Sequence, residues 1–470
     1  MRLPSMRLGS SRLGGGSENI SLQYGASKSF ALTTSTLTRT RGAFGKLYTP
    51  TVGASVGAND FELLEPWSKC RLCNLSDAGV VNAYQGDVGF ILDGTNGQVM
   101  VEIPKFYYRV EKQTDAWEWV LSPIAQPGFS VHPAFVTLGI ERSRIYVSAY
   151  LGAEVAGKLV SVTGVLPQYD KTRAQFRTLG RARGAGWGIM DFTSYSALQL
   201  LLLVMTANFD AQTVVGRGIA DMYHDATCVA TVAESSVNRI IVANAKAAGF
   251  LAGYRMGIGT SLGGHQIAKY RLVTSVDVYD ASNKAISFDG AAVNVALGNI
   301  AYTMPSDTGG ADALGIHTGR AAGTDGKTEV SFFGIQGLWG NFFQFLDGWN
   351  MDTSYYPWVN DNPATYEDAK FASPYKRIEA VVPSAADGYV RRFGFDPAAS
   401  WAMLTGEVGG SSVGPVGDYL YRSATPNERV LLVGGYWING SSDGPWDWNV
   451  SFASSIAYGF FGARLLYKPG

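Results

Sequence analysis

The stretch that decides the fold is Gly337-Leu-Trp-Gly-Asn-Phe-Phe-Gln-Phe-Leu-Asp-Gly348. It crowds large aromatic side chains around Gly340 and Gly348, which favours a close approach of the backbone beside a large apolar area. The aromatic residues in it and next to it include Trp339, Phe342, Phe345 and Trp349. Its Asn341 and Asp347 side chains can hydrogen-bond to the backbone of a loop. We therefore expect this stretch to be part of the structural scaffold.

A second stretch of the same character lies near the end of the chain, at Val430-Leu-Leu-Val-Gly-Gly-Tyr-Trp437. The glycine pair before Trp437 predicts a tight entry into a strand. The chain then closes with Gly462-Ala-Arg-Leu-Leu466. Because Arg464 lies in an apolar setting, we expect its guanidinium to pair with a buried carbonyl or carboxylate.

The segment between these two anchors, residues 436–461, differs in composition. It interleaves Tyr, Trp and Phe with Gly, Ser, Asn and Asp, which is the composition of antibody-like binding surfaces. From residue 446 to residue 452 polar and apolar positions alternate, as along a strand. The polar face would hold Asp447, Asn449 and Ser451, and the apolar face Trp448 and Val450. An aromatic-rich core strand is the alternative explanation, which we adopt for Trp437, Trp448 and Val450.

The overall composition disfavours some classes of protein. The chain has 470 residues, of which 46% are hydrophobic and 16% charged, and its formal net charge is -1. That balance gives no electrostatic attraction to nucleic acid or to an anionic membrane. The 57 glycines and 12% aromatic residues favour a turn-rich protein over a helical bundle. The most apolar run, Leu200–Met205, is far too short to span a bilayer, so we expect no membrane insertion.

Cysteine and histidine residues are too few and too scattered to predict a metal site. The three cysteines are Cys70, Cys73 and Cys228. A structural zinc site needs a second ligand pair beside a Cys-x-x-Cys, and no such pair lies near Cys70 and Cys73, so two free thiols in a turn are favoured. The four histidines occur singly, at His132, His224, His265 and His317. We expect His132 to be a structural hydrogen-bonding group.

The chain is expected to fall into three parts. Residues 1–50 carry seven basic residues and one acidic residue, with too few large apolar residues for a core of their own. We expect an extended N-terminal arm that is ordered against a partner such as a neighbouring subunit; a disordered tail is the alternative. Residues 51–94 have short apolar runs broken by Gly, Asn and Asp, which is typical of a small β-rich region. Residues 95–470 form the remaining domain.

Within residues 95–470 the pattern predicts strands first and then two helices. The strands are expected at Val99–Val110, with Pro104 inside it, at Trp117–Ser122 and at Ile145–Tyr150. A helix over Thr172–Arg183 has one polar and one apolar face. A second helix, capped by Asp191 or Ser194, runs to about residue 208. Its Leu-rich centre has no polar stripe, so it should be buried. Beyond residue 252, short strands and glycine-rich loops are expected.

Two earlier segments complete an ordered set of four. They are Val101-Glu-Ile-Pro-Lys-Phe-Tyr-Tyr108 and Gly128-Phe-Ser-Val-His-Pro-Ala-Phe135, the latter followed by Ile145–Gly152. Together with residues 337–348 and 430–466, this set resembles the C-type-lectin-like fold shared by formylglycine-generating enzymes and by bacteriophage proteins diversified by retroelements. Those phage proteins include the tropism determinants that choose a host receptor. The resemblance covers residues 95–470 and implies an α+β fold with short twisted antiparallel strands, two main helices and long loops.

The resemblance also implies where a ligand would bind. Retroelement-diversified relatives carry variable positions in a fixed framework. Laid over this sequence, those positions fall on Tyr436, Ile438, Ser442, Asp447, Asn449, Ser451, Phe452, Ile456, Tyr458 and Phe460. Large apolar side chains among them would be unusual on a solvated loop without a ligand. The residues expected to form one exposed patch are Tyr436, Ile438, Asp447, Asn449, Ile456, Tyr458 and Phe460. Those expected to be buried beneath it are Trp437, Trp448, Val450 and Arg464.

The function implied by the resemblance is host attachment. We expect a bacteriophage tail-fibre or receptor-binding protein that recognises a host cell-surface protein or glycan through residues 436–461. Residues 1–50 would join it to other tail proteins. Because phage fibres are commonly trimeric, we expect a homotrimer, made in the host cytoplasm and carried in the virion. A structural virion protein, such as a head fibre or tail-tip component that uses the same domain for assembly, is the alternative.

An enzyme on the same fold is the third hypothesis, and the sequence disfavours it. Formylglycine-generating enzymes bind copper through a late cysteine pair, but this chain has no cysteine after Cys228. Related iron-dependent sulfoxide synthases need a histidine cluster. Calcium-dependent lectins use Glu-Pro-Asn or Gln-Pro-Asp beside Trp-Asn-Asp, of which Trp358-Val-Asn-Asp361 is only a partial match. We therefore expect no catalytic residues, no cofactor and no bound metal.

Overall fold

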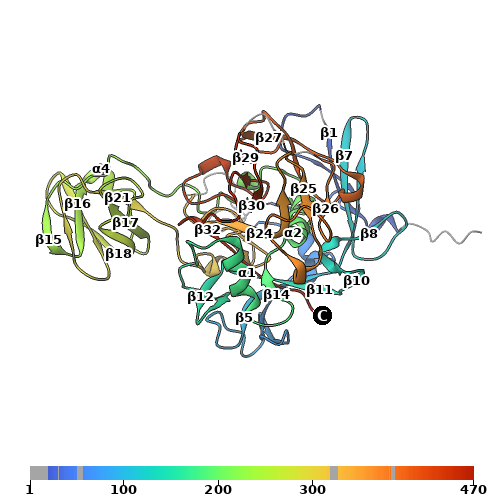
Figure 1. Cartoon of the computed structure of the whole chain (residues 1–470), viewed down its shortest axis with the longest axis horizontal. Helices are drawn as coiled ribbons and strands as arrows, with labels where there is room; N and C mark the ends of the chain where they lie inside the picture. Colours follow the sequence, from blue (N-terminus) through green and yellow to red (C-terminus); the bar gives the residue numbers. More distant parts are fainter. Residues whose placement is uncertain (1–18, 30, 50–56, 318–325, 381, 383–386) are drawn as a thin grey trace, which may run out of the picture.

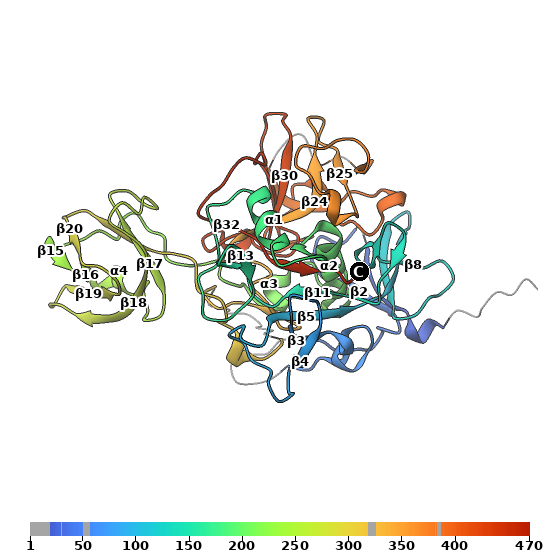
Figure 2. The same cartoon turned by 60° about the horizontal axis from the view of Figure 1, so that its bottom comes forward.

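The computed structural model describes residues 19–29, 31–49, 57–317, 326–380, 382 and 387–470. Figure 1 and Figure 2 show a large body and a smaller lobe to one side of it. Strands predominate over helices, so the expected β-rich α+β class is confirmed. Among the described residues, no helix is long and apolar enough to cross a membrane.

One sheet of the body joins the end of the chain to much earlier segments. Its strand order is β14-β33-β11-β5-β3-β4. The strands span Arg71–Leu75 (β3), Val81–Tyr84 (β4), Gln98–Pro104 (β5), Arg144–Ser148 (β11), Trp187–Ile189 (β14) and Leu465–Tyr467 (β33). Because β3 pairs with β5, a hydrogen-bonded ladder crosses the boundary that we expected at residue 94, and residues 57–94 belong to the body.

The second large sheet carries both glycine-rich stretches. Its strand order is β26-β25-β24-β30-β31-β29-β27-β28, and β32 also pairs with β24. The strands span Phe343–Met351 (β24), Pro357–Val359 (β25), Lys376–Arg377 (β26), Gly388–Phe393 (β27), Thr405–Val408 (β28), Tyr419–Arg422 (β29), Arg429–Val433 (β30), Trp448–Val450 (β31) and Phe461–Gly462 (β32). Every residue of β24 is buried, which agrees with the scaffold role expected for residues 337–348.

The two expected helices are present as α1, Arg173–Arg181, and α2, Phe192–Thr206. The Thr172 hydroxyl caps α1, and the Asp191 carboxylate caps α2 by accepting a hydrogen bond from the N–H of Ser194. Every residue of α2 is buried, as the absence of a polar stripe predicts. Shorter helices span Ala211–Val214 (α3) and Asn244–Ala247 (α4).

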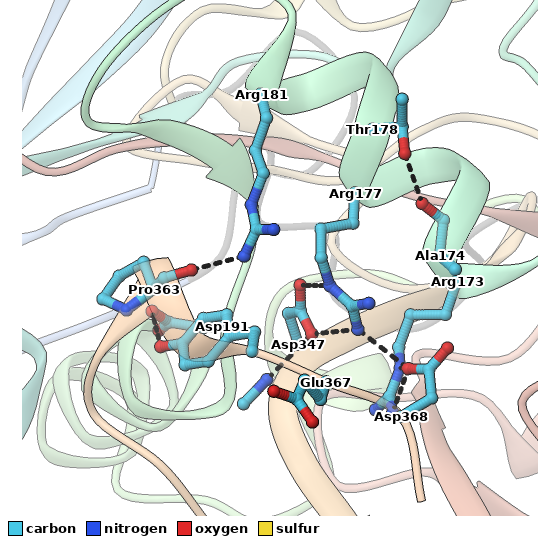
Figure 3. A network of polar contacts seen from close by, with 12 residues as sticks. Arg173, Ala174, Arg177, Thr178, Arg181, Asp191, Asp347, Pro363, Glu367 and Asp368 are labelled. Carbon is cyan, nitrogen blue, oxygen red and sulfur yellow. Dashed lines mark hydrogen bonds and ion pairs between the residues drawn. The ribbon is translucent and has the colours of Figure 1, made fainter. Parts of the chain in front are cut away.

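Charged side chains of α1 fix it to β24, as Figure 3 shows. Arg177 donates to both carboxylate oxygens of Asp347, at 2.6 and 2.7 Å, and to Asp368 at 2.8 Å. The fully buried Arg173 also donates to Asp368. Asp347 therefore has a guanidinium as its main partner, besides the backbone N–H of Gly348 at 3.1 Å. Paired and hydrogen-bonded charges of this kind hold one geometry.

The single strand expected at Val99–Val110 is two strands, β5 and β6, which lie in different sheets. Pro104 ends β5 because proline cannot donate to a ladder. The sheet that contains β6 has the order β2-β1-β7-β6-β8. Its strands span Tyr24–Ser29 (β1), Thr38–Arg41 (β2), Tyr107–Lys112 (β6), Ala116–Ser122 (β7) and Ser130–Val131 (β8). Short ladders pair Val136–Thr137 (β9) with Ile140–Glu141 (β10), Ala153–Val155 (β12) with Lys158–Val160 (β13), and Ser331–Phe332 (β22) with Ile335–Gln336 (β23).

The extended arm expected for residues 1–50 is wrong for the part that the structure describes. β1 pairs with β2 on one side and with β7 on the other. Tyr24, Ala26 and Leu37 are buried in the core of the body. This part of the chain has too few apolar residues for a core of its own. It can still form a strand, because the body supplies the other side of the contact. Residues 1–18, 30 and 50 of the expected arm lie outside the described residues.

The lobe, residues 223–304, is a feature that we did not predict within the expected domain 95–470. Its main sheet has the order β16-β19-β18-β17-β21, and β15 pairs with β20. The strands span Glu234–Val237 (β15), Arg239–Ala243 (β16), Arg255–Gly259 (β17), Ala268–Val278 (β18), Asn283–Phe288 (β19), Val293–Val295 (β20) and Ile300–Thr303 (β21). Buried side chains, among them Ile240, Met256 and Ile286, form a hydrophobic cluster within the lobe. The N–H of Thr303 donates to the carbonyl of Tyr223 at 2.8 Å, so the two ends of the lobe lie together.

Candidate functional site

Buried strands hold both ends of segment 436–461. Gly434 and Gly435, with φ of 92° and 74°, turn the chain out of β30 through a conformation that favours glycine. The N–H of Gly340 donates to the carbonyl of Gly434 at 2.7 Å, which ties this turn to the first glycine-rich stretch. The segment then passes through β31, paired with β30, and ends in β32, paired with β24. The glycine pair therefore forms a turn that leaves a strand, not the strand entry that we expected.

Large buried side chains form the base of the segment. Trp448 and Val450 are fully buried, and Trp437 is 7% exposed, as expected. Trp446 is also fully buried. The buried Arg464 donates at 2.6–3.1 Å to the Gln344 side chain and to the carbonyl oxygens of Ser148, Ala149, Gln336 and Gly337. We expected a buried carbonyl or carboxylate as the partner of this guanidinium, and in the structure its partners are carbonyl oxygens.

The prediction that Asp447 and Asn449 are exposed is wrong. Asp447 is fully buried and Asn449 is 6% exposed. One side of β31 packs against α2, where the rings of Trp448 and Phe192 meet at 5.8 Å. On the other side, Asp443 folds back so that it lies beside Asp447. An alternating pattern predicts a solvated face only where that face is left uncovered. Neither residue can belong to an exposed patch.

Of the other residues expected in the exposed patch, only Tyr458 is exposed, because the rest pack against buried side chains. Four of the predicted site residues meet. Tyr458 is 44% exposed. The half-buried ones are Tyr436, Ile438, Ser442, Ser451, Phe452, Ile456 and Phe460. The Phe460 ring lies between Tyr436, at 4.7 Å, and Tyr458, at 5.2 Å, and it stacks on both. Phe452 packs edge-on against Tyr458 at 5.5 Å. We call Tyr436, Phe452, Tyr458 and Phe460 the aromatic group.

Residues outside the segment adjoin the aromatic group, and no local sequence pattern marks them. The N–H of Asp170 donates to the carbonyl of Tyr458 at 3.2 Å. The Tyr270 hydroxyl, from β18 of the lobe, donates to the carbonyl of Gly459 at 3.1 Å. Tyr270 and Gly459 are 189 positions apart in the chain, so only the folded structure brings them together.

Three carboxyl groups are buried together, two of them in the segment and one, Asp418, outside it. Asp418, Asp443 and Asp447 are each 0–1% exposed. Burial raises the pKa of each well above its ordinary value, and the neighbouring carboxylates raise the pKa of Asp443 and Asp447 further. Asp418 accepts a hydrogen bond from the N–H of Trp446 at 2.7 Å. A carboxyl with a raised pKa holds its proton to higher pH.

His132, Cys70 and Cys73 lie in other elements than this segment. His132 Nδ1 accepts from the N–H of Ala134, and burial lowers the His132 pKa to about 3, which fits a structural role. Cys70 and Cys73 are buried free thiols; Cys70 directly follows the 3-10 helix Trp67–Lys69, and Cys73 lies within β3, not in a turn. Burial raises the pKa of Cys73 to about 12, which disfavours a thiolate ligand. In the part of the chain that the structure describes, no group of three or more His, Cys, Asp or Glu side chains is arranged to hold a metal.

A crevice elsewhere in the body exposes little of its aromatic lining. It lies at β1, β7 and β27, holds about 570 Å³ of open space, and is lined by residues that include Lys28, Trp117, Arg391 and Phe393. Trp117 and Phe393 are each only 5% exposed, so their ring faces are covered. The aromatic group of segment 436–461 is therefore the stronger candidate for a binding surface.

Comparison with known proteins assigns no family to the chain. No protein-family model matches it, and no curated protein matches it. A fold alone does not define a function, so the function has to be argued from the site itself.

Proposed function

We propose that the chain is a receptor-binding protein of a bacteriophage tail or fibre, with a C-type-lectin-like domain, and that it recognises a host cell-surface molecule through segment 436–461. The observation that carries the proposal is the contrast within this segment. Trp446, Trp448 and the nearby Arg464 are fully buried, whereas Tyr458 and Phe460 are stacked and partly exposed. Binding surfaces use rigid aromatic anchors of this kind because ordering them costs little conformational entropy.

The framework around the segment supports the lectin-like assignment. The two stretches that carry the resemblance are neighbours in one sheet, since β24 pairs with both β30 and β32. A surface segment that is fixed at both ends can change its exposed side chains without loss of the fold. We assign it no catalytic role, because it contains no cysteine or histidine and its carboxyl groups, Asp443 and Asp447, are fully buried.

Cell binding tests the proposal. Fluorescently labelled protein is incubated with a panel of bacterial strains, and cell-bound fluorescence is measured. We expect binding to at least one strain and a loss of affinity of about tenfold or more for Tyr458→Ala. Tyr279→Ala is the matched control, because Tyr279 is a similarly exposed tyrosine (41%) in the lobe. Binding to no strain, or equal binding by Tyr458→Ala, contradicts the proposal and favours a structural virion protein.

The working form in this proposal is a homotrimer that is attached to other tail proteins. The support is the common trimeric symmetry of phage fibres. Native mass spectrometry of the full chain measures the oligomeric state, and a stable monomer contradicts this part of the proposal.

A further inference from the structure

The lobe meets the body beside the aromatic group. The hydroxyl of Tyr270, in β18, donates to the carbonyl of Gly459, and the backbone N–H of Asp170 donates to the carbonyl of Tyr458. Figure 1 and Figure 2 both place the C-terminal part of the chain near β32 on the side of the body that faces the lobe. These hydrogen bonds fix residues 458–459 against two segments that lie outside 436–461.

Those two segments carry a ring pair and an ion pair of their own. The rings of Tyr169 and Tyr270 pack at 4.4 Å. The Lys269 ammonium lies over both rings, 4.7 Å from the centre of Tyr169 and 5.3 Å from that of Tyr270. Lys269 also pairs with Asp170 at 3.2 Å, and both charged side chains are partly exposed, at 35% and 49%. The two charges compensate each other, so this ion pair presents no net charge to a ligand.

The geometry points to a composite recognition surface, in which Tyr169, Asp170 and Lys269 extend the aromatic group and the ligand is a neutral saccharide. This inference rests on the proposed function and names the ligand class for the same site. It also gives the lobe a role, because β18 supplies Lys269 and Tyr270.

A saccharide fits the surface better than a protein does. A pyranose ring has an apolar face of C–H groups, which packs on an aromatic ring, and a rim of hydroxyls. Tyr458 offers a partly exposed ring, and Lys269 and Asp170 offer a donor and an acceptor for hydroxyls. Tyr458 is 44% exposed and Tyr270 only 9% exposed, so a single ring, rather than a broad aromatic area, is open to a ligand.

Binding to a printed array of purified bacterial polysaccharides, neutral and acidic, tests the inference with the full chain. We expect binding to at least one neutral polysaccharide. Tyr458→Ala should weaken it about tenfold or more, and Tyr169→Ala and Lys269→Gln each about threefold or more, since truncated interface aromatics and polar contacts cost about that much. Tyr279→Ala should bind like the wild type. Lys269 is partly exposed, so Lys269→Gln remains informative if Tyr169→Ala fails to fold.

The outcomes separate this inference from the proposed function. If Tyr458→Ala loses binding while Tyr169→Ala and Lys269→Gln bind normally, the composite surface is overturned and the proposed function stands. Binding to acidic polysaccharides alone overturns the neutral ligand. Cell binding that protease treatment of the cells abolishes and periodate oxidation leaves intact overturns the saccharide but keeps a receptor. Absence of both cell binding and array binding overturns the proposed function together with the inference.

Discussion

Asp443 and Asp447 direct their carboxylates toward the same point beside the backbone of Gly435. A side chain at position 435 would collide with an oxygen of each. Both residues are fully buried, and within the described residues none of their four carboxylate oxygens has a hydrogen bond of normal geometry. Two like charges repel strongly in such an interior, so we infer that the pair holds at least one proton at neutral pH. Burial first, and the neighbouring carboxylates second, raise the pKa of both groups well above the ordinary value.

Replacing Asp443 by Asn should stabilise the fold at neutral pH. A carboxyl with a raised folded-state pKa gives stability that is fully present below the unfolded-state pKa of about 4. That stability is lost as the pH rises through the folded-state pKa, and Asp443→Asn removes this loss. The free energy of unfolding of Asp443→Asn should therefore exceed that of the wild type by an amount that grows between about pH 5 and pH 8, to about 1 kcal/mol or more. Urea unfolding at several pH values measures it.

The control for this pH dependence is Glu379→Gln, because the Glu379 side chain is 61% exposed and pairs with Arg377 at the surface. The free energy of unfolding of Glu379→Gln should differ little from that of the wild type at every pH.

Added EDTA should leave the melting temperature of the wild type unchanged. If EDTA lowered that temperature in the wild type but not in Asp443→Asn, a bound cation rather than a proton would neutralise the pair. An Asp443→Asn variant less stable than the wild type at every pH would contradict the prediction.

Arg464→Met should destabilise the body severely. The guanidinium donates hydrogen bonds to the Gln344 side chain and to backbone carbonyls, which include those of Ser148 in β11 and of Gly337. Its loss leaves several buried acceptors without a donor, at about 1–3 kcal/mol each, and we expect a total loss of roughly 3–5 kcal/mol after relaxation. Arg377→Met, in an exposed ion pair, should change stability by less than about 1 kcal/mol. Equal effects of the two variants on urea unfolding would show that Arg464 does not hold the framework.

The lobe should fold without the body. Its hydrophobic cluster lies within residues 228–301, and its ends are joined by the hydrogen bond between Thr303 and Tyr223. Residues 223–304 expressed alone should therefore show a cooperative thermal transition by circular dichroism. In the reverse experiment, replacement of residues 224–302 by a short Gly-Ser linker should leave the body folded. A gradual, non-cooperative melt of the isolated lobe would show that its stability depends on the body.

Local signals were sufficient to predict several elements. The capping residues Thr172 and Asp191 lie directly before α1 and α2, so the sequence around each helix contains what starts it. The aromatic and glycine content of residues 337–348 likewise predicted a buried element, and β24 is one. The apolar residues on either side of Arg464 likewise predicted a buried, hydrogen-bonded guanidinium, because they lie directly beside it in the sequence.

Features that depend on distant partners were not predictable in this way. β1 is part of the body because Tyr24 pairs with Leu121, almost a hundred positions away. The exposure of Asp447 depends on where the loop with Asp443 folds, which the alternation of side chains does not encode. Tyr270 reaches Gly459 only because the lobe docks beside segment 436–461. A single sequence shows periodicity and caps, whereas these contacts are set by tertiary packing.

The last prediction separates the base of segment 436–461 from its surface. Trp437 is 7% exposed and packs with Ile219 and Met222, so Trp437→Ala should lower the free energy of unfolding by roughly 3–5 kcal/mol. Tyr458 is 44% exposed, so Tyr458→Ala should cost less than about 1 kcal/mol while it weakens cell binding. Phe460 lies between two rings, so Phe460→Ala should reduce both stability and binding. Urea unfolding and cell binding are measured on the same preparations. If Tyr458→Ala unfolded the protein, or bound cells normally whenever it was folded, the aromatic group would be core and not a recognition surface.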